Sequence, residues 1–158
     1  MKRHWVLPVF LITGALWGHP MGNFSVSHYS KIEVASRGLE IRYILDLAEI
    51  PTFQLLQQWN LDAGSPRAEI ERQAAAQARE WSKGLKIEIG GRPIVPGFER
   101  AEVTVDKGAG GMAVLRVTSV LQVAAAPGSL AFEDTNFPDR AGWKEGRPLA
   151  LSRRVEPE

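Results

Sequence analysis

A strict two-residue alternation between Asn23 and Val34 constrains the fold of this chain more than any other feature. The side that is mostly apolar consists of Phe24, Val26, His28, Ser30, Ile32 and Val34. The opposite side consists of Asn23, Ser25, Ser27, Tyr29, Lys31 and Glu33. This period is typical of a β-strand with one buried face. Residues 39–47 alternate again after a short turn that ends in Gly38, so the two segments predict an antiparallel hairpin.

The rest of the chain predicts one longer helix and several more strands. Residues 52–59 indicate a short helical or turn segment, and a helix is expected from the capping pair Ser65-Pro66 to about Lys83. Further strands are expected at residues 85–89, 92–95, 98–105, 113–123 and 129–133. About seven strands with one inserted α-helix predict a mostly β, α+β fold. Its form is either an antiparallel immunoglobulin-like β-sandwich or an antiparallel sheet covered by a helix.

The first eighteen residues have the pattern of a secretory signal peptide. Lys2 and Arg3 precede an apolar run from Trp5 to Trp17, which is shorter than the ~20 residues of a membrane-spanning helix. Cleavage is expected after Gly18, which makes His19 the new N-terminus. Three regions are therefore predicted: a signal peptide at 1–18, an exported β-rich domain at 19–145 and an irregular charged tail at 146–158. The mature chain is expected outside the inner membrane, for example in the periplasm, with no membrane span.

The cleavage site has an alternative, and the composition of the mature chain limits its possible partners and chemistry. Cleavage after Ala15 would instead leave the histidine three residues inside the chain. Without Lys2 and Arg3 the 19 basic residues fall to 17, against 18 acidic residues, so composition gives no electrostatic case for nucleic-acid binding. The chain has no cysteine, which excludes disulfides and thiolate chemistry. The core alone has to hold the domain together.

Four side chains are candidates for a metal site. A mature N-terminus at His19 offers an α-amine and an imidazole to one ion, and imidazole suits nickel, copper and zinc. His28 is a candidate for a third nitrogen, and Asp46 and Glu49 at the end of the adjoining strand for completing or orienting the site. The alternatives remain open: His28 as a hydrogen-bonded core residue, and Asp46 and Glu49 as turn and capping groups. No nucleophile elbow or zinc-protease helix motif is present, so no enzyme is predicted.

The segment from Glu133 to Glu145 is rich in polar residues. Its Asp134, Asn136 and Asp139 have the oxygen ligands of a calcium loop but not the spacing of an EF-hand. The simpler interpretation is a polar turn held by two aromatic side chains, Phe137 and Trp143.

Three separate blocks of sequence carry a resemblance to a known family. They are His-Pro-Met-Gly-Asn-Phe-Ser-Val-Ser-His-Tyr-Ser at 19–30, Asp-Leu-Ala-Glu-Ile-Pro-Thr-Phe-Gln at 46–54 and Asp-Thr-Asn-Phe-Pro-Asp-Arg-Ala-Gly-Trp-Lys-Glu at 134–145. Together they resemble the extracytoplasmic N-terminal region of membrane proteins in the nickel/cobalt transporter family. The resemblance implies an exported domain displayed beside a transport channel for divalent transition metals, with a membrane transporter domain or subunit as its partner.

The chain departs from that family after Glu145. Family members continue into another apolar strand and then membrane helices, whereas residues 146–158 are charged and without period. A free-standing relative, a fragment and a frame change are all compatible with this departure. Transport by these residues alone is not expected, because a pore needs spanning segments. Two hypotheses follow: an accessory domain that binds the transported metal, or a structural or partner-binding module that does not touch metal.

Overall fold

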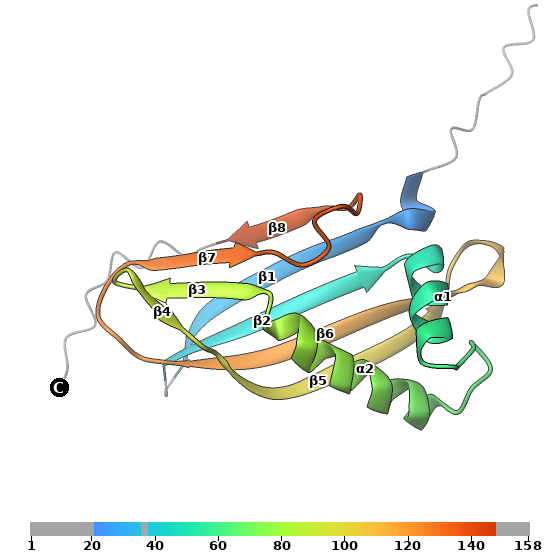
Figure 1. Cartoon of the computed structure of the whole chain (residues 1–158), viewed down its shortest axis with the longest axis horizontal. Helices are drawn as coiled ribbons and strands as arrows, with labels where there is room; N and C mark the ends of the chain where they lie inside the picture. The colour runs from blue at the N-terminus through green and yellow to red at the C-terminus, as the bar shows by residue number, and fades with distance from the viewer. Residues whose placement is uncertain (1–20, 36–37, 148–158) are drawn as a thin grey trace, which may run out of the picture.

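The computed structural model describes residues 21–35 and 38–147, which form an α+β fold of two sheets and two α-helices (Figure 1). This confirms the predicted fold class. The larger sheet contains, in spatial order, β5 (Gly97–Lys107), β6 (Ala113–Ala124), β2 (Gly38–Leu47), β1 (Val26–Ala35) and β8 (Lys144–Arg147). The smaller sheet contains β4 (Arg92–Ile94), β3 (Leu85–Ile89) and β7 (Leu130–Asp134). The helices are α1 (Glu49–Gln58) and α2 (Arg67–Ser82), and two 3₁₀ turns are η1 (Met21–Phe24) and η2 (Ala109–Gly111).

The hairpin of β1 and β2 forms the centre of the large sheet, as the alternation predicts. Its register pairs Val26 with Leu47 and Ala35 with Gly38, and it places His28 opposite Leu45. β6 pairs with the other side of β2, and all of these neighbours are antiparallel. Because side chains alternate between the two faces, His28 and the buried residues of β2 lie on the same face of the sheet.

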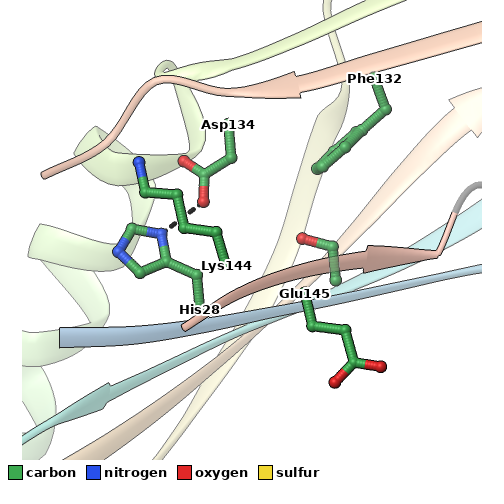
Figure 2. Close-up of a pocket in the computed structure, with 6 residues that line it drawn as sticks. His28, Phe132, Asp134, Lys144 and Glu145 are labelled. Atoms are coloured by element: carbon green, nitrogen blue, oxygen red, sulfur yellow. Dashed lines mark hydrogen bonds and ion pairs between the residues drawn. The ribbon is translucent and has the colours of Figure 1, made fainter. Parts of the chain in front are cut away.

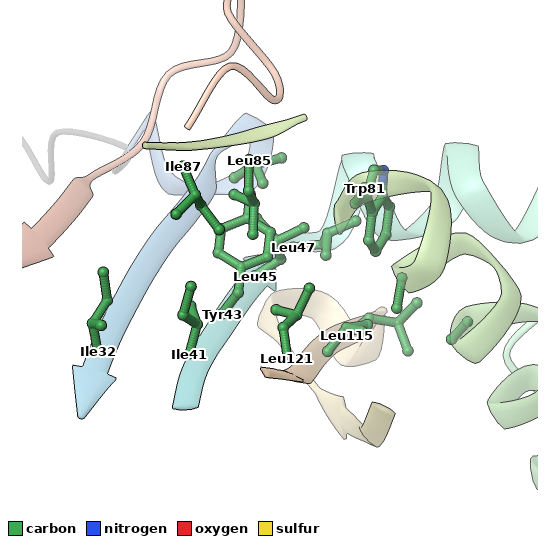
Figure 3. Close-up of a cluster of buried hydrophobic side chains, with 14 of the residues drawn as sticks. Ile32, Ile41, Tyr43, Leu45, Leu47, Trp81, Leu85, Ile87, Leu115 and Leu121 are labelled. Carbon is green, nitrogen blue, oxygen red and sulfur yellow. The ribbon is translucent and has the colours of Figure 1, made fainter. Parts of the chain in front are cut away.

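That face is covered by both helices and by the smaller sheet (Figure 1). Figure 3 shows side chains of β3 and of α2 meeting those of β2 and β6 in one apolar cluster. Its labelled members are Ile32, Ile41, Tyr43, Leu45, Leu47, Trp81, Leu85, Ile87, Leu115 and Leu121. Ala74 and Ala78 of α2 are fully buried, because a small side chain lets the helix approach the sheet closely. A core of this kind holds the domain without disulfides.

The helix starts differ from the prediction. α1 begins at Glu49, and Pro51 lies in its first turn, where a missing N–H costs no hydrogen bond. α2 begins at Arg67 without a side-chain cap, so the predicted cap at Ser65 is wrong. The Ser65 hydroxyl instead accepts a hydrogen bond from the Asp62 N–H in the preceding turn.

The segment after Asp134 also differs from the prediction. It ends in an eighth strand, β8, which pairs in parallel with β1 and extends to Arg147, so residues 146 and 147 do not belong to an irregular tail. Trp143 does not hold the turn, because its side chain is 80% exposed. The predicted signal peptide at 1–18 and the rest of the tail, residues 148–158, lie outside the described residues. Among the helices that the structure describes, none is long and apolar enough to cross a bilayer.

Candidate functional site

His28 is the predicted site residue that lies at the centre of a polar cluster. It is on β1, facing the core as predicted, and its side chain is only 3% exposed. Its Nδ1 lies 2.5 Å from Oδ2 of Asp134, at the end of β7, although the two residues are 106 positions apart (Figure 2). The Asp134 side chain is 9% exposed. The pair therefore links the large sheet to the small one inside the protein.

Tyr43 and Asn136 extend this cluster on both sides. The Tyr43 hydroxyl on β2 lies 3.2 Å from His28 Nδ1 and accepts a hydrogen bond from Asn136 Nδ2. The same amide group donates to the carbonyl of Trp81, at the end of α2, and to Oδ1 of Asp134. Asn136 thus connects a loop, a helix end and two strands, with the two hydrogens of its amide group shared among three acceptors.

Close backbone approach places Asn136 there. A Cβ at residue 84 would lie 2.4 Å from the amide oxygen of Asn136, so only glycine leaves room for this side chain. The Thr135 N–H and hydroxyl both donate to the carbonyl of Gly84, at 3.0 and 2.8 Å. The turn after β7 is therefore fixed to the start of β3 by main-chain as well as side-chain bonds.

Phe137 covers the cluster from the loop side. Its ring stands edge-on to the imidazole of His28, with centroids 5.7 Å apart, and packs at 5.6 Å against the ring of Trp81. The residue has a positive φ of 46°, which is unfavourable for a bulky side chain and requires stabilising contacts around it. The prediction that Phe137 holds this polar turn agrees with these contacts.

Electrostatics favour an ionised Asp134. Burial alone would raise the pKa of this carboxyl, but the hydrogen bonds from His28 and from the Asn136 N–H outweigh it and hold the pKa below its ordinary value. Burial and the neighbouring Asp134 charge raise the pKa of Tyr43, so this hydroxyl keeps its proton. The hydrogen bonds from these donors make Asp134 a structural link between the two sheets.

The lowered pKa of Asp134 predicts a specific loss of stability in acid. A carboxyl whose folded-state pKa lies below its unfolded value stabilises the protein above about pH 4, and this contribution disappears as the pH falls through the folded-state pKa. Urea unfolding between pH 5 and pH 2 should show Asp134→Asn with a shallower pH dependence than the wild type. Asp139→Asn, which changes an exposed carboxyl of the same loop, is the matched control. Equal slopes for the wild type and Asp134→Asn would contradict the assignment.

Asp46 lies on the opposite face of the sheet. It pairs with Ser27 in the β1–β2 register, one position out of phase with His28. Its two carboxylate oxygens accept hydrogen bonds from Nε and Nη2 of Arg116, at 2.5 and 2.8 Å. This exposed pair is a cross-strand contact between β2 and β6, and it points away from His28.

Glu49 lies at the start of α1 and is buried, with 7% of its surface exposed. Its Oε1 accepts a hydrogen bond of 2.6 Å from the backbone N–H of Ala109, in the loop between β5 and β6. The predicted ligands His28, Asp46 and Glu49 therefore each bind a different group of the protein itself. Among the described residues, no three histidine, aspartate or glutamate side chains lie close enough together to hold one metal ion. His19 lies outside those residues.

A small cavity of about 240 Å³ adjoins the pair between β7 and the β1–β8 edge. It is lined by His28, Ser30, Phe132, Asp134, Lys144 and Glu145 (Figure 2). Two of the polar groups around it have protein partners: Asp134 is bonded to His28, and the Lys144 amine donates to the carbonyl of Asn136 at 2.7 Å. Nε2 of His28 is buried and has no hydrogen-bond partner. An aspartate on Nδ1 is the arrangement that orients metal-binding histidines, but His28 belongs to no group of three possible ligand side chains among the described residues.

The alternation of β1 predicts where His28 lies but not what it contacts. Asp134, Tyr43 and Asn136 come from distant parts of the chain, and the polar segment after β7 is the signal that points to two of them. Comparison with family models, with curated proteins and with solved structures finds no match for this chain.

Proposed function

We propose that this chain is an exported accessory domain of a nickel or cobalt transport system, acting by binding and not by catalysis. It would stand outside the membrane beside a transporter subunit and hold a divalent transition metal through its mature N-terminus. The proposal rests on the three blocks of family resemblance and on one observation: these blocks, distant in sequence, are joined to one another in space.

The joins between the blocks are hydrogen bonds. The N–H groups of Val26 and His28 donate to the carbonyls of Ala141 and Trp143, which connects the first block to the third. Nη2 of Arg140 donates to the Gln54 side chain at 2.6 Å, which connects the third block to the second. Blocks that build one structural unit have a reason to occur together in a sequence. This supports a shared domain, and hence a shared setting, with the resembling proteins.

Within this proposal, the metal contact belongs to His19. Asp46 and Glu49 already bind Arg116 and the Ala109 N–H, and the ring of His28 is buried beneath Phe137. A free N-terminal histidine offers two nitrogens to nickel, cobalt, copper or zinc without disturbing the core.

Isothermal titration of these four metals into the exported, processed protein tests the proposal, after mass spectrometry has identified the N-terminus. We expect binding that His19→Ala abolishes while the circular dichroism spectrum stays unchanged. Asp46→Ala is the matched control, because it removes a predicted ligand that already has a partner, and it should bind metal as the wild type does. A folded protein that starts at His19 and binds none of the four metals would refute the metal contact.

The engagement of His28, Asp46 and Glu49 within the fold favours a second candidate. The domain then serves as a structural or partner-binding module of a membrane protein and does not touch metal. In that case His19→Ala leaves its association with the partner unchanged, whereas substitutions on an exposed apolar surface weaken it.

A further inference from the structure

The outer edge of β5 is the longest strand edge that the described part of the chain leaves unpaired. β5 has 11 residues and is the last strand on its side of the large sheet (Figure 1). The other edge strands, β8, β4 and β7, have only 4, 3 and 5 residues. Proteins usually block a long edge with proline or a bulge, because its free N–H and C=O groups can pair with another strand. The bulge of β5 lies between Phe98 and Arg100, and the rest of the strand, to Lys107, is regular and contains no proline.

The regular part of β5 has one apolar face and one charged face. The apolar face consists of three half-buried residues that pack against the core: Ala101, Val103 and Val105. The charged face consists of four exposed residues: Arg100, Glu102, Thr104 and Asp106. A strand that pairs with this edge therefore meets apolar side chains on one face and charged side chains on the other.

We propose that β5 pairs antiparallel with β5 of a second copy of this chain, around a two-fold axis at Val103. In this register Arg100 lies opposite Asp106 of the second copy, and the symmetry produces that pair twice. On the apolar face Ala101 lies opposite Val105 of the second copy, and the two copies of Val103 lie opposite each other. The two five-stranded sheets then form one continuous sheet.

The charges on β5 favour this register over the neighbouring ones. With the axis moved by one residue to Glu102, the two copies of Glu102 lie opposite each other. With the axis moved to Thr104, Glu102 lies opposite Asp106. Both shifts place like charges in a cross-strand pair, which is destabilising, and larger shifts shorten the regular segment that pairs. Because β5 is complementary to itself in one register, a second copy fits this edge better than an unrelated strand.

The backbone at the proposed axis is open to a partner. The Val103 carbonyl accepts a hydrogen bond of 3.1 Å from Nη2 of Arg67 on α2, so donors other than those of β6 can reach it. Two residues opposite each other in an antiparallel pair can exchange two N–H···O bonds. Arg67 has to release the carbonyl, but its side chain is 56% exposed and also binds Glu71. Because water can replace such a bond, a strand can displace it at small cost. The inference is independent of whether the domain binds metal.

Sedimentation velocity of the processed chain over a range of concentrations tests this pairing. We expect a monomer–dimer equilibrium for the wild type. Arg100→Asp and Asp106→Arg each turn both opposite-charge pairs into like-charge pairs, so each variant alone should dimerise about tenfold more weakly or worse. An equimolar mixture of the two variants should dimerise as the wild type does, because a mixed pair of copies again contains two opposite-charge contacts.

Lys86→Asp is the matched control, because it reverses an exposed charge that pairs with Glu133 on the small sheet. It should leave dimerisation unchanged. Circular dichroism verifies the fold of each variant, and the neutral substitutions Arg100→Gln and Asp106→Asn should weaken the dimer by less than the reversals do. A wild type that stays monomeric at every concentration up to the millimolar range would overturn the proposal. Reversals that leave dimerisation unchanged, or a mixture of folded variants that does not dimerise, would overturn it as well.

Discussion

His28→Ala should lower the free energy of unfolding by about 3–5 kcal/mol, because it leaves the buried Asp134 carboxylate without its main partner. It also removes the ring against which Phe137 packs. Urea unfolding at pH 7 measures the loss. Lys31→Ala, on the same strand, breaks an exposed ion pair with Glu33 and should change stability by less than about 1 kcal/mol.

A double-mutant cycle separates the pair from the general cost of truncation. Asp134→Ala alone should also be strongly destabilising, but the double variant should cost less than the two single variants added together. The reason is that the second substitution removes the group that the first one left unpaired. Additive losses would contradict a direct interaction between His28 and Asp134.

Gly142→Ala should cost about 3–4 kcal/mol, because the segment before β8 lies directly against the backbone of β1. Gly142 has a φ of 154°. A Cβ on this residue would lie 1.9 Å from the carbonyl oxygen of Val26, so the two atoms would overlap. Neither β1 nor the segment before β8 can move apart without breaking the hydrogen bonds that the N–H groups of Val26 and His28 donate to this segment.

Gly91→Ala is the matched control for this substitution. Gly91 also has a positive φ, 73°, but a Cβ there would meet nothing within 4 Å, so this variant has backbone strain without a clash. It should cost about 1–2 kcal/mol by the same unfolding measurement. Equal losses in the two variants would show that the close approach at Gly142 contributes nothing.

The elements that sequence predicts well are those with a strong side-chain period. The alternation in residues 23–34 and 39–47 leads directly to the β1–β2 hairpin and to the buried side of His28. The same period also bears on Asp46: if Leu45 and Leu47 face the core, Asp46 faces away from His28 and cannot share an ion with it. His28 and Asp46 lie near the same end of the predicted hairpin, but their side chains project from opposite faces of the sheet.

β8 is not predictable from such a pattern. Lys144 and Glu145 are exposed and Gly146 follows, so the strand exists through backbone pairing with β1 and not through apolar alternation. The His28–Asp134 pair cannot be predicted from the sequence, for a different reason. It joins strands of two different sheets, and neither local propensity nor periodicity contains information on which sheet covers which.

The most direct test of the proposed metal-handling role is a cobalt titration of the processed, ¹⁵N-labelled protein followed by NMR. Co²⁺ is paramagnetic, so the amide signals that respond most strongly locate the bound ion. We predict the largest effects at the amides of Met21 and Gly22, the described residues nearest in sequence to His19, with Nδ1 of His28 retaining its hydrogen bond to Asp134. The absence of any localised effect, or effects centred on His28 with loss of that bond, would contradict it.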